Sequence, residues 1–471
     1  MSQTILAIDV GSTKISAVIA EVTEAGALEI TGHGFAKSQG VKKGIITNIE
    51  LASRSIKKAL SDARRIAGNS ISVATISISN AYAKSLNSTG IVNIPHKDIS
   101  LKEINRVMET ALYNANIPNE YEVIHVLPYN FKVDDQDFIE DPYGMNASRM
   151  EVDVNIILTQ KSSLSNLTKA VRSAGVDIEA IVLNSYASAI ATMNEDEKEL
   201  GVVVIDMGGQ SSNLIIHTGN SIRYNDFIPV GSNHVTNDLS MALHTPLQVA
   251  EKVKREHGNL IERSSDVIDL PVIGDEESSN SISLEIVHSV ISSRVEELLV
   301  LLEKSFAKSA LREQVGSGII LTGGMTKLKG LREMAQAIFH GMPVRIGFPR
   351  TQGGLFEELN DAAFSTVIGL LLYQIGEHTQ YEIDNSRRLL HNKSEAIDER
   401  EALGNIRLDR DRTAGKKATN DLLEGRRAQG NTGSKEDDGD ETDFSFDDLP
   451  DTQEGNHTLL GRFLDWARQL F

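Results

Sequence analysis

The sequence contains no cysteine among its 471 residues, and aromatic side chains make up only 5% of it. The absence of cysteine excludes disulfide bonds, cysteine-ligated zinc, iron–sulfur clusters and catalysis by a thiol. No stretch reaches about 18 uninterrupted apolar residues, so we expect no transmembrane helix and only peripheral contact with any membrane. The N-terminus has neither the basic region nor the long apolar region of a secretion signal, so we expect none.

Basic residues are also scarce, because 47 lysines and arginines face 66 acidic residues and give a net charge of −19. Phosphate contacts with DNA or RNA need clustered cations, so we expect no nucleic-acid partner. Ten acidic residues and no basic one lie between Glu436 and Glu454. The surrounding stretch, residues 381–457, is polar and poor in aromatic residues. It cannot bury enough apolar surface to offset chain entropy, which predicts a disordered acidic linker.

Before residue 381, short apolar runs alternate with helical patterns, which is typical of an α/β protein. The length predicts about two to four domains or subdomains. The predicted strands are Ile5–Val10, Ser72–Ser79, Glu122–Phe131, Val152–Thr159, Val202–Ile205 and Ile319–Leu321. The predicted helices are Ile49–Ala67, Leu101–Ala115, Leu164–Ala174, Pro246–His257 and Leu284–Ala310.

Two segments of the chain resemble each other, residues 5–15 and residues 202–212. Each has an apolar strand, then Asp-x-Gly, then small hydroxyl residues. Their spacing of 197 residues (206 − 9) is too large for a solenoid repeat. The repetition therefore predicts two related halves that face each other.

The first of these segments suits a phosphate-binding turn. Gly11 allows the backbone to turn sharply and approach a ligand, and the N–H groups of Ser12 and Thr13 can point at phosphate oxygens. Lys14 supplies a cation, and Asp9 can hold the water shell of Mg²⁺. The alternative is an ordinary β-hairpin with Asp and Ser as turn formers.

The second segment favours the phosphate hypothesis. Two such turns would hold a polyphosphate from both sides, with Asp206 as the second carboxylate near the metal. The residues of this second turn are Gly208, Gly209, Gln210 and Ser211.

A third element, Gly323-Gly324-Met325, follows an apolar strand. Adjacent glycines leave room for a flat ring, and Met325 can cover one face of it. The alternative is a plain strand-to-helix loop.

The order of these three elements resembles the actin/Hsp70/sugar-kinase ATPase superfamily, and within it the chain resembles the FtsA family of bacterial cell-division proteins. Further stretches carry the resemblance across residues 5–372: Ser188–Leu200, Gly231–Leu239, Ala250–Gly258, Leu321–Gly324 and Ser365–Leu370. The resemblance implies an actin-like two-domain ATPase fold that binds ATP and Mg²⁺, with Asp9 and Asp206 as catalytic and metal-holding carboxylates. It also implies that Glu251 and Lys254 contact the ribose and base, although most charged pairs at three-residue spacing are solvated ion pairs on a helix.

The resemblance also implies a domain organisation. Residues 1–81 and 161–200 would form the first domain, with residues 82–160 inserted as a subdomain for subunit contact. The alternative is an insertion that has no role in assembly. Residues 201–380 would form the second domain and a return helix, and residues 232–311 within it a partner-binding subdomain. Residues 381–457 would be the linker and residues 458–471 a membrane-targeting helix.

The second turn departs from the family pattern Asp-x-Gly-Gly-Gly-Thr-x-Asp. Gln210 replaces the third glycine, Ser211 the threonine and Asn213 the final aspartate. A side chain at Gln210 crowds the γ-phosphate region, and Asn213 removes a negative charge. These changes predict nucleotide binding with at most slow ATP hydrolysis.

The last fourteen residues, 458–471, predict an amphipathic helix. At 100° per residue its apolar side chains fall within about 160°. They include Leu459, Leu460, Phe463, Leu464, Trp466, Leu470 and Phe471. A helix of this kind favours binding to anionic membrane lipids. The alternatives are docking on the protein's own core or in a partner's groove.

The resemblance implies a protein that forms filaments on the cytoplasmic face of the inner membrane at the division site. It implies binding of the FtsZ C-terminal tail and recruitment of other cell-division proteins. Arg294 is the candidate contact for an acidic tail, although a plain helix-surface arginine is equally compatible with the sequence. The alternatives to this function are a small-molecule kinase of the same superfamily and a scaffold like the pilus-assembly ATPases.

Overall fold

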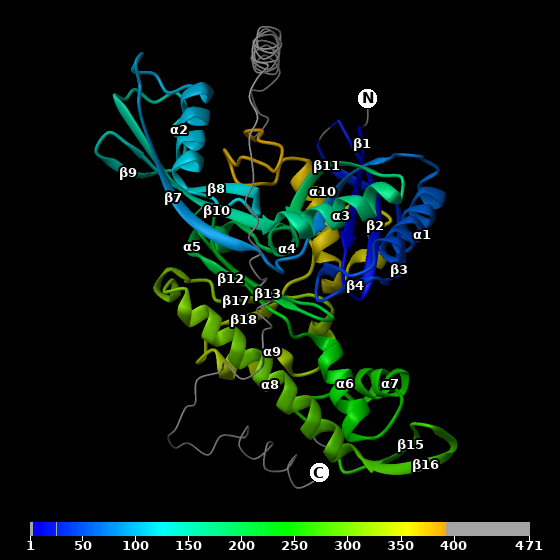
Figure 1. The fold of residues 1–471 in the computed structure, drawn as a ribbon. Helices are drawn as coiled ribbons and strands as arrows, with labels where there is room; N and C mark the ends of the chain where they lie inside the picture. The colour runs from blue at the N-terminus through cyan, green and yellow to red at the C-terminus, as the bar shows by residue number, and fades with distance from the viewer. Residues whose placement is uncertain (1–2, 25, 220, 263, 392–471) are drawn as a thin grey trace, which may run out of the picture. The chain divides into compact units, whose positions relative to one another are not determined.

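The computed structural model describes residues 3–24, 26–219, 221–262 and 264–391 (Figure 1). The terminal helix predicted at residues 458–471 and most of the predicted linker lie outside these residues. The described part contains two lobes and an inserted subdomain, each with its own sheet and apolar core. No helix among the described residues is long and apolar enough to cross a membrane.

The first lobe is built on a six-stranded sheet in the order β11-β6-β1-β2-β3-β19. Strands β1, β2 and β3 pair antiparallel, whereas β6 and β11 add parallel to β1. The strands are β1 (Gln3–Val10), β2 (Lys14–Val22), β3 (Leu28–Lys37), β6 (Val73–Ile78), β11 (Asp177–Leu183) and β19 (Gly353–Gly354). A small hairpin of β4 (Val41–Lys42) and β5 (Ile45–Ile46) follows β3.

Helices pack on this sheet. Helix α1 (Ile49–Ala67) contacts β2 and β3, α3 (Lys161–Ser173) packs on α1, and α10 (Ser365–Gln374) contacts β1 and α4 (Asn184–Thr192). Helix α1 begins where the Asn48 side chain accepts the N–H of Leu51 at 3.0 Å, and it ends at Gly68 with φ of 64°. Both are common helix-end signals, which is why sequence and structure agree on the bounds of α1.

The second lobe repeats the topology of the first. Its five-stranded sheet has the order β14-β13-β12-β17-β18, with β12, β13 and β14 antiparallel and β17 and β18 added parallel to β12. The strands are β12 (Val202–Met207), β13 (Ser212–Thr218), β14 (Ser221–Ile228), β17 (Ile319–Thr322) and β18 (Val344–Ile346). The repetition seen in the sequence is therefore a repetition of strand order.

The second lobe also carries helices and a hairpin; α5 precedes its first strand, and the others follow its third strand (Figure 1). The helices are α5 (Glu195–Leu200), α6 (Ser232–Ala242), α7 (Leu247–His257), α8 (Leu284–Lys308) and α9 (Leu331–Ile338). The hairpin pairs β15 (Val267–Val272) with β16 (Asp275–Ser283). Helix α6 packs on both α7 and α8.

The inserted subdomain is an antiparallel sheet in the order β7-β10-β8-β9 with helix α2 (Leu101–Asn114) packed on it. The strands are β7 (Lys84–Asn93), β8 (Tyr121–Val133), β9 (Gln136–Ile139) and β10 (Arg149–Gln160). Its core has its own set of buried side chains, among them Met108, Phe131 and Met150.

One prediction is wrong at its boundary. The sequence analysis starts the linker at residue 381, but Tyr381, Glu382, Ile383 and Asp384 are 0 to 2% exposed. Tyr381 and Ile383 belong to the core of the inserted subdomain. The charged composition of residues 381–391 concealed this, because two buried apolar residues and two buried carboxylates do not change the average polarity of the stretch.

Candidate functional site

A cavity of about 470 Å³ is lined by both repeated turns. The turn between β1 and β2 and the turn between β12 and β13 are tight hairpin turns. The hairpin interpretation is therefore confirmed for both turns, and both also form part of the cavity wall. The predicted residues in the lining are Asp9, Gly11, Ser12, Thr13, Lys14, Asp206, Gly208, Gly209, Gln210, Ser211, Glu251, Gly323, Gly324 and Met325.

The two aspartates lie at equivalent strand ends, where Asp206 is buried and Asp9 is partly buried. The hydroxyl of Ser77 donates to Asp9 at 2.8 Å, and the hydroxyl of Ser188 donates to Asp206 at 2.8 Å. Burial raises the pKa of Asp9. Burial, with a smaller contribution from the nearby Asp9 charge, raises the pKa of Asp206 to about 6. Two such carboxylates favour a cation, since a positive charge would offset the cost of burying them.

The donor set fits a magnesium ion that keeps much of its water shell. The described residues contain no group of three or more His, Asp or Glu placed to hold a metal ion directly. Mg²⁺ commonly uses one or two carboxylates together with waters and substrate phosphates. The Oδ1 atom of Asn213 also lines this region, is buried and has no hydrogen-bond partner among the described residues.

Lys14 is held by a segment that the sequence analysis did not connect with it. Its Nζ donates to the carbonyl of Ala363 at 3.0 Å and lies 3.3 Å from the centroid of the Phe364 ring. Burial lowers the pKa of Lys14 to about 8. The short helix at residues 362–364 thus fixes the cation at the cavity wall. No local pattern links these two segments, which are far apart in the sequence.

The hairpin of β4 and β5 connects the two turns. The N–H of Gly44 donates to the Ser12 hydroxyl at 2.7 Å, and the N–H of Lys43 donates to Gln210 Oε1 at 2.8 Å. Gln210 therefore reaches from the second lobe to a backbone amide of the first. This position, where the family pattern has glycine, is occupied by a side chain that bridges the lobes.

The first residues of helix α6 donate backbone hydrogen bonds to the second turn. The N–H groups of Ser232 and Asn233 donate to the carbonyls of Gly208 and Gly209 at 3.0 and 2.7 Å. Asn233 also lines the cavity, and the sequence analysis did not include it.

Glu251 and Lys254 have different surroundings. Lys254 Nζ donates to Ser232 Oγ at 2.7 Å, to Thr236 Oγ1 at 2.8 Å and to Glu251 Oε2 at 2.7 Å, and burial lowers its pKa. Glu251 lines the cavity, whereas Lys254 is absent from the lining. Arg255, four residues after Glu251, does line it and could have been found from that helical spacing.

The third element is a strand-to-helix loop that also forms part of the cavity wall. Gly323 has φ of 91°, and a short 3-10 helix follows at residues 324–327. Met325 is only 4% exposed and packs into the core of the second lobe. It can therefore present only a small part of its surface to a ligand.

Arg294 lies outside the cavity, on helix α8. Its Nε donates to Asp238 Oδ2 on α6 at 2.5 Å, and its guanidinium also pairs with Glu297. The neighbouring Asp238 raises the pKa of Arg294. An acidic partner at this position would have to share the guanidinium with two carboxylates. The predicted membrane-facing residues, Leu459 to Phe471, lie outside the described residues.

Comparison with known proteins yields several matches. The family model "Cell division protein FtsA" matches residues 203–369, and the model "SHS2 domain inserted in FTSA" matches residues 80–158. The cell division protein FtsA of Helicobacter pylori is 38% identical over 423 residues, which is 83% of this chain and 86% of that protein. The FtsA of Pseudomonas aeruginosa is 36% identical over 372 residues, which is 78% of this chain and 88% of that protein.

Among solved structures, the PilM–PilN type IV pilus biogenesis complex contains a chain with the same fold. The TM-score is 0.58 at 16% identity, over 79% of this chain and 98% of that chain. The expected α/β, actin-like fold with an inserted subdomain is confirmed.

Proposed function

Because the chain belongs to the FtsA family of cell-division proteins, we propose that it is an ATP-binding protein that polymerises on the cytoplasmic face of the inner membrane and anchors the FtsZ ring there. The observation that carries this proposal is the cavity in which two equivalent hairpin turns, each preceded by an aspartate that lines the cavity, face one another.

Different parts of the cavity wall suit the phosphates and the nucleoside of a nucleoside triphosphate. The backbone N–H groups at Ser12, Thr13 and Gly209 would bind phosphate oxygens. Asp9 and Asp206 would hold the water shell of Mg²⁺, which neutralises the phosphates when bound. Glu251 and the Gly323–Met325 loop would contact the nucleoside. Lys14 would remain positioned by Ala363 and Phe364 beside the phosphates.

Hydrolysis would be slow in this cavity. Gln210 is engaged by the Lys43 N–H and occupies the place where a bare glycine would leave room for water. Asn213 supplies a neutral oxygen instead of a carboxylate. The nucleotide would then act mainly as a ligand that stabilises one arrangement of the two lobes, which is what assembly requires.

Membrane attachment would come from residues 458–471. Full burial of one Leu or Phe side chain contributes about 1.5–3 kcal/mol, and ordering the helix costs about 1 kcal/mol per residue. One helix with two arginines would therefore bind anionic lipid weakly and reversibly. A filament that presents many such helices would bind tightly through effective concentration.

Partner binding would involve the stretch 232–311, with Arg294 at the surface of α8 as a contact for the acidic FtsZ tail. Residues 80–158, which match the inserted-domain model, would provide contacts between subunits. Other cell-division proteins would be recruited to the assembled filament.

Sedimentation with and without ATP, and with and without vesicles of anionic lipid, tests the proposal. Pelleting that requires ATP, and flotation with lipid that requires residues 458–471, are the expected results. ATP consumption that appears only with a sugar or another small acceptor would instead support a kinase. ATP binding without any lipid binding would support a scaffold like the pilus-assembly proteins.

A further inference from the structure

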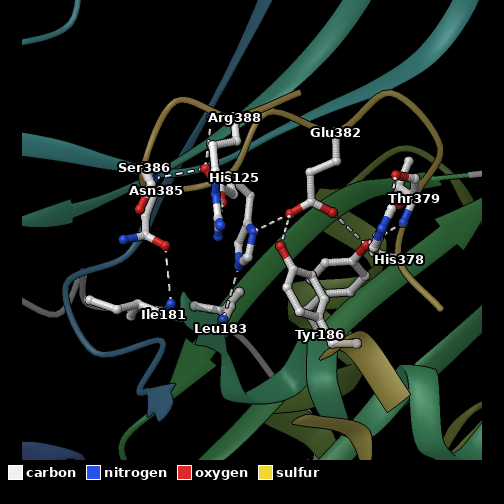
Figure 2. Close-up of polar contacts among 12 residues, drawn as sticks. His125, Ile181, Leu183, Tyr186, His378, Thr379, Glu382, Asn385, Ser386 and Arg388 are labelled. Atoms are coloured by element: carbon white, nitrogen blue, oxygen red, sulfur yellow. Dashed lines mark hydrogen bonds and ion pairs between the residues drawn. The ribbon is translucent and has the colours of Figure 1, made fainter. Parts of the chain in front are cut away.

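Residues 379–390, which follow helix α10, form a strap between the first lobe and the inserted subdomain (Figure 2). Ile383 exchanges two backbone hydrogen bonds with Val126 of β8, at 2.9 and 3.1 Å. The Tyr381 hydroxyl donates to Asp141 of the inserted subdomain at 2.6 Å. On the other side, the N–H of Ile181 in β11 donates to Asn385 Oδ1 at 3.1 Å.

The strap covers an incomplete edge of the inserted sheet. Strand β10 pairs with β8 along its whole length, but β9 pairs with β8 only at Phe131 and Val133. The edge of β8 that faces away from β10 is left unpaired by β9 around Val126, and without the strap it would present unpaired N–H and C=O groups, which are costly when buried. Ile383 satisfies them and is itself 2% exposed.

Glu382 of the strap is fully buried and accepts hydrogen bonds from three elements. The N–H of Leu183 donates to His125 Nε2 at 3.0 Å, so the ring proton of neutral His125 lies on Nδ1 and donates to Glu382 Oε1 at 2.6 Å. Tyr186 of α4 and Tyr373 of α10 donate to the same carboxylate at 2.9 and 2.8 Å. Burial raises the pKa of both tyrosines well above 10, so both remain donors.

The hydrogen bonds from His125, Tyr186 and Tyr373 to Glu382 depend on one another. A buried carboxylate is tolerated only when its donors are all in place. Figure 2 shows Glu382 between the His125 ring of β8 and the Tyr186 ring of α4. A shift of the inserted subdomain relative to the first lobe would therefore leave Glu382 short of a donor.

The contact between the inserted subdomain and the second lobe is of a different kind. Asn225 of β14 donates to the Ser85 hydroxyl of β7 at 2.9 Å, and the Arg223 guanidinium lies 4.1 Å from the Tyr129 ring centroid. Asn155 donates to the Ile222 carbonyl at 2.9 Å, but its Oδ1 has no partner among the described residues. Among the residues that the structure describes, no fully buried charged side chain takes part in these contacts.

We propose that the strap joins the inserted subdomain and the first lobe into one rigid body, and that the contact with β14 is the one that changes when the lobes move. The inference rests on the proposed function in one respect, since nucleotide binding is taken to move the lobes. Glu382 is then a positioning residue for subunit assembly, although it touches neither the nucleotide nor another subunit.

Hydrogen exchange tests the rigid body without any nucleotide. Glu382→Gln should raise the exchange rates of the Val126 and Ile383 amides about tenfold or more, because an NH₂ group replaces one acceptor oxygen and leaves a buried donor without an acceptor. The amides of β12 and β17 should keep their rates. Glu377→Gln is the matched control, because Glu377 pairs with Arg350 and is 34% exposed. Unchanged exchange at Val126 would overturn the proposal. If Glu382→Gln does not fold, Tyr373→Phe removes a single donor and should give the same local pattern.

Two engineered disulfides test the claim that the contact with β14 changes when the lobes move. Because the sequence contains no cysteine, each introduced pair can bond only with itself. Oxidising Val126→Cys/Ile383→Cys should leave ATP-dependent pelleting within about twofold of the reduced protein, whereas oxidising Ser85→Cys/Asn225→Cys should reduce it about tenfold or more. The reverse pattern would overturn the proposal. If the wild-type protein neither binds ATP nor pellets, the proposed function fails, and the exchange experiment still decides whether the strap is rigid.

Discussion

Thr13 and Gly209, one from each repeated turn, meet across the cavity. A Cβ atom at position 209 would lie 1.8 Å from the Thr13 hydroxyl oxygen and 3.0 Å from the Thr13 Cβ. Glycine is therefore required at position 209 by the approach of the other lobe. The two turns lie close enough to act on one ligand together.

This contact predicts the effect of Gly209→Ala. The added methyl must push the two turns apart, so we expect ATP affinity to fall about tenfold or more, which is the range of a lost phosphate contact. Titration with a fluorescent ATP analogue measures it. Adding Thr13→Ala removes the closer of the two clashing atoms and should restore part of the affinity. Wild-type affinity in Gly209→Ala would show that the turns separate freely.

The raised pKa of Asp206 predicts a pH dependence of stability. Its pKa is about 6 in the folded protein against 3.8 as the ordinary value, so the folded state holds the proton more tightly. The contribution of Asp206 to the free energy of unfolding is therefore present below about pH 4 and is lost as the pH rises to about 6. Without Mg²⁺ or nucleotide, Asp206→Asn should gain stability relative to wild type as the pH rises from 5 to 7.5, by on the order of 1–3 kcal/mol. Urea unfolding at both pH values measures it, and a constant difference would contradict the assignment.

Two of the three departures from the family pattern, Gln210 and Asn213, predict slow release of phosphate after ATP hydrolysis. Replacing Gln210 by Gly removes the side chain that holds the Lys43 N–H, and Asn213→Asp restores a carboxylate. The double variant should release phosphate about tenfold faster or more, which corresponds to about 1.4 kcal/mol of barrier. Single-turnover release from bound ATP is the measurement. Ser211→Thr, the third departure, is the matched control and should change the rate little. Rapid release by the wild type would show that these residues do not limit hydrolysis.

The ion pair of Arg294 with Asp238 predicts that substitutions at these two positions change the affinity for an acidic FtsZ tail in opposite directions. Arg294→Ala should weaken binding of an acidic FtsZ tail peptide by about fivefold, the value of a partly screened charge contact. Asp238→Asn removes a carboxylate that competes for the guanidinium and should strengthen binding. Fluorescence anisotropy with the peptide measures both. Equal binding by all three proteins would place the tail elsewhere.

The predicted helix at residues 458–471 should bind lipid through its apolar face, so substitutions on that face should affect membrane binding more than those on its polar face. Deleting residues 458–471 should abolish flotation with anionic vesicles, and Trp466→Glu should reduce it about tenfold or more, since one buried aromatic contributes about 1.5–3 kcal/mol. Gln469→Glu adds the same charge on the polar face and should reduce flotation far less. ATP affinity should be unchanged in all three. Undiminished flotation of Trp466→Glu would contradict the assigned apolar face.

Most of the element pattern of the lobes could be predicted from the sequence. The expected helix Ile49–Ala67 has the observed bounds, and Leu284–Ala310 ends two residues after the observed α8. These elements have strong periodicity and recognisable ends. The two repeated turns could also be predicted, because the same sequence motif occurs twice in the chain.

Contacts between distant segments could not be predicted in the same way. Nothing near Lys14 indicates that Ala363 and Phe364 hold its ammonium group. Nothing near Glu382 indicates that its three donors come from residues 125, 186 and 373. Composition instead led to the wrong start of the linker, since local averages measure the polarity of a segment and not the partners it finds in the fold.

The edge of β8 that only the strap pairs determines where the chain can be truncated. A fragment that ends at residue 378 would expose the β8 edge at Val126 and the His125 ring, and such bare edges invite pairing between molecules. A fragment that ends at residue 391 keeps Ile383 in its place. Solubility on truncation should therefore change abruptly within thirteen residues (391 − 378) that look, by composition, like the beginning of a tail.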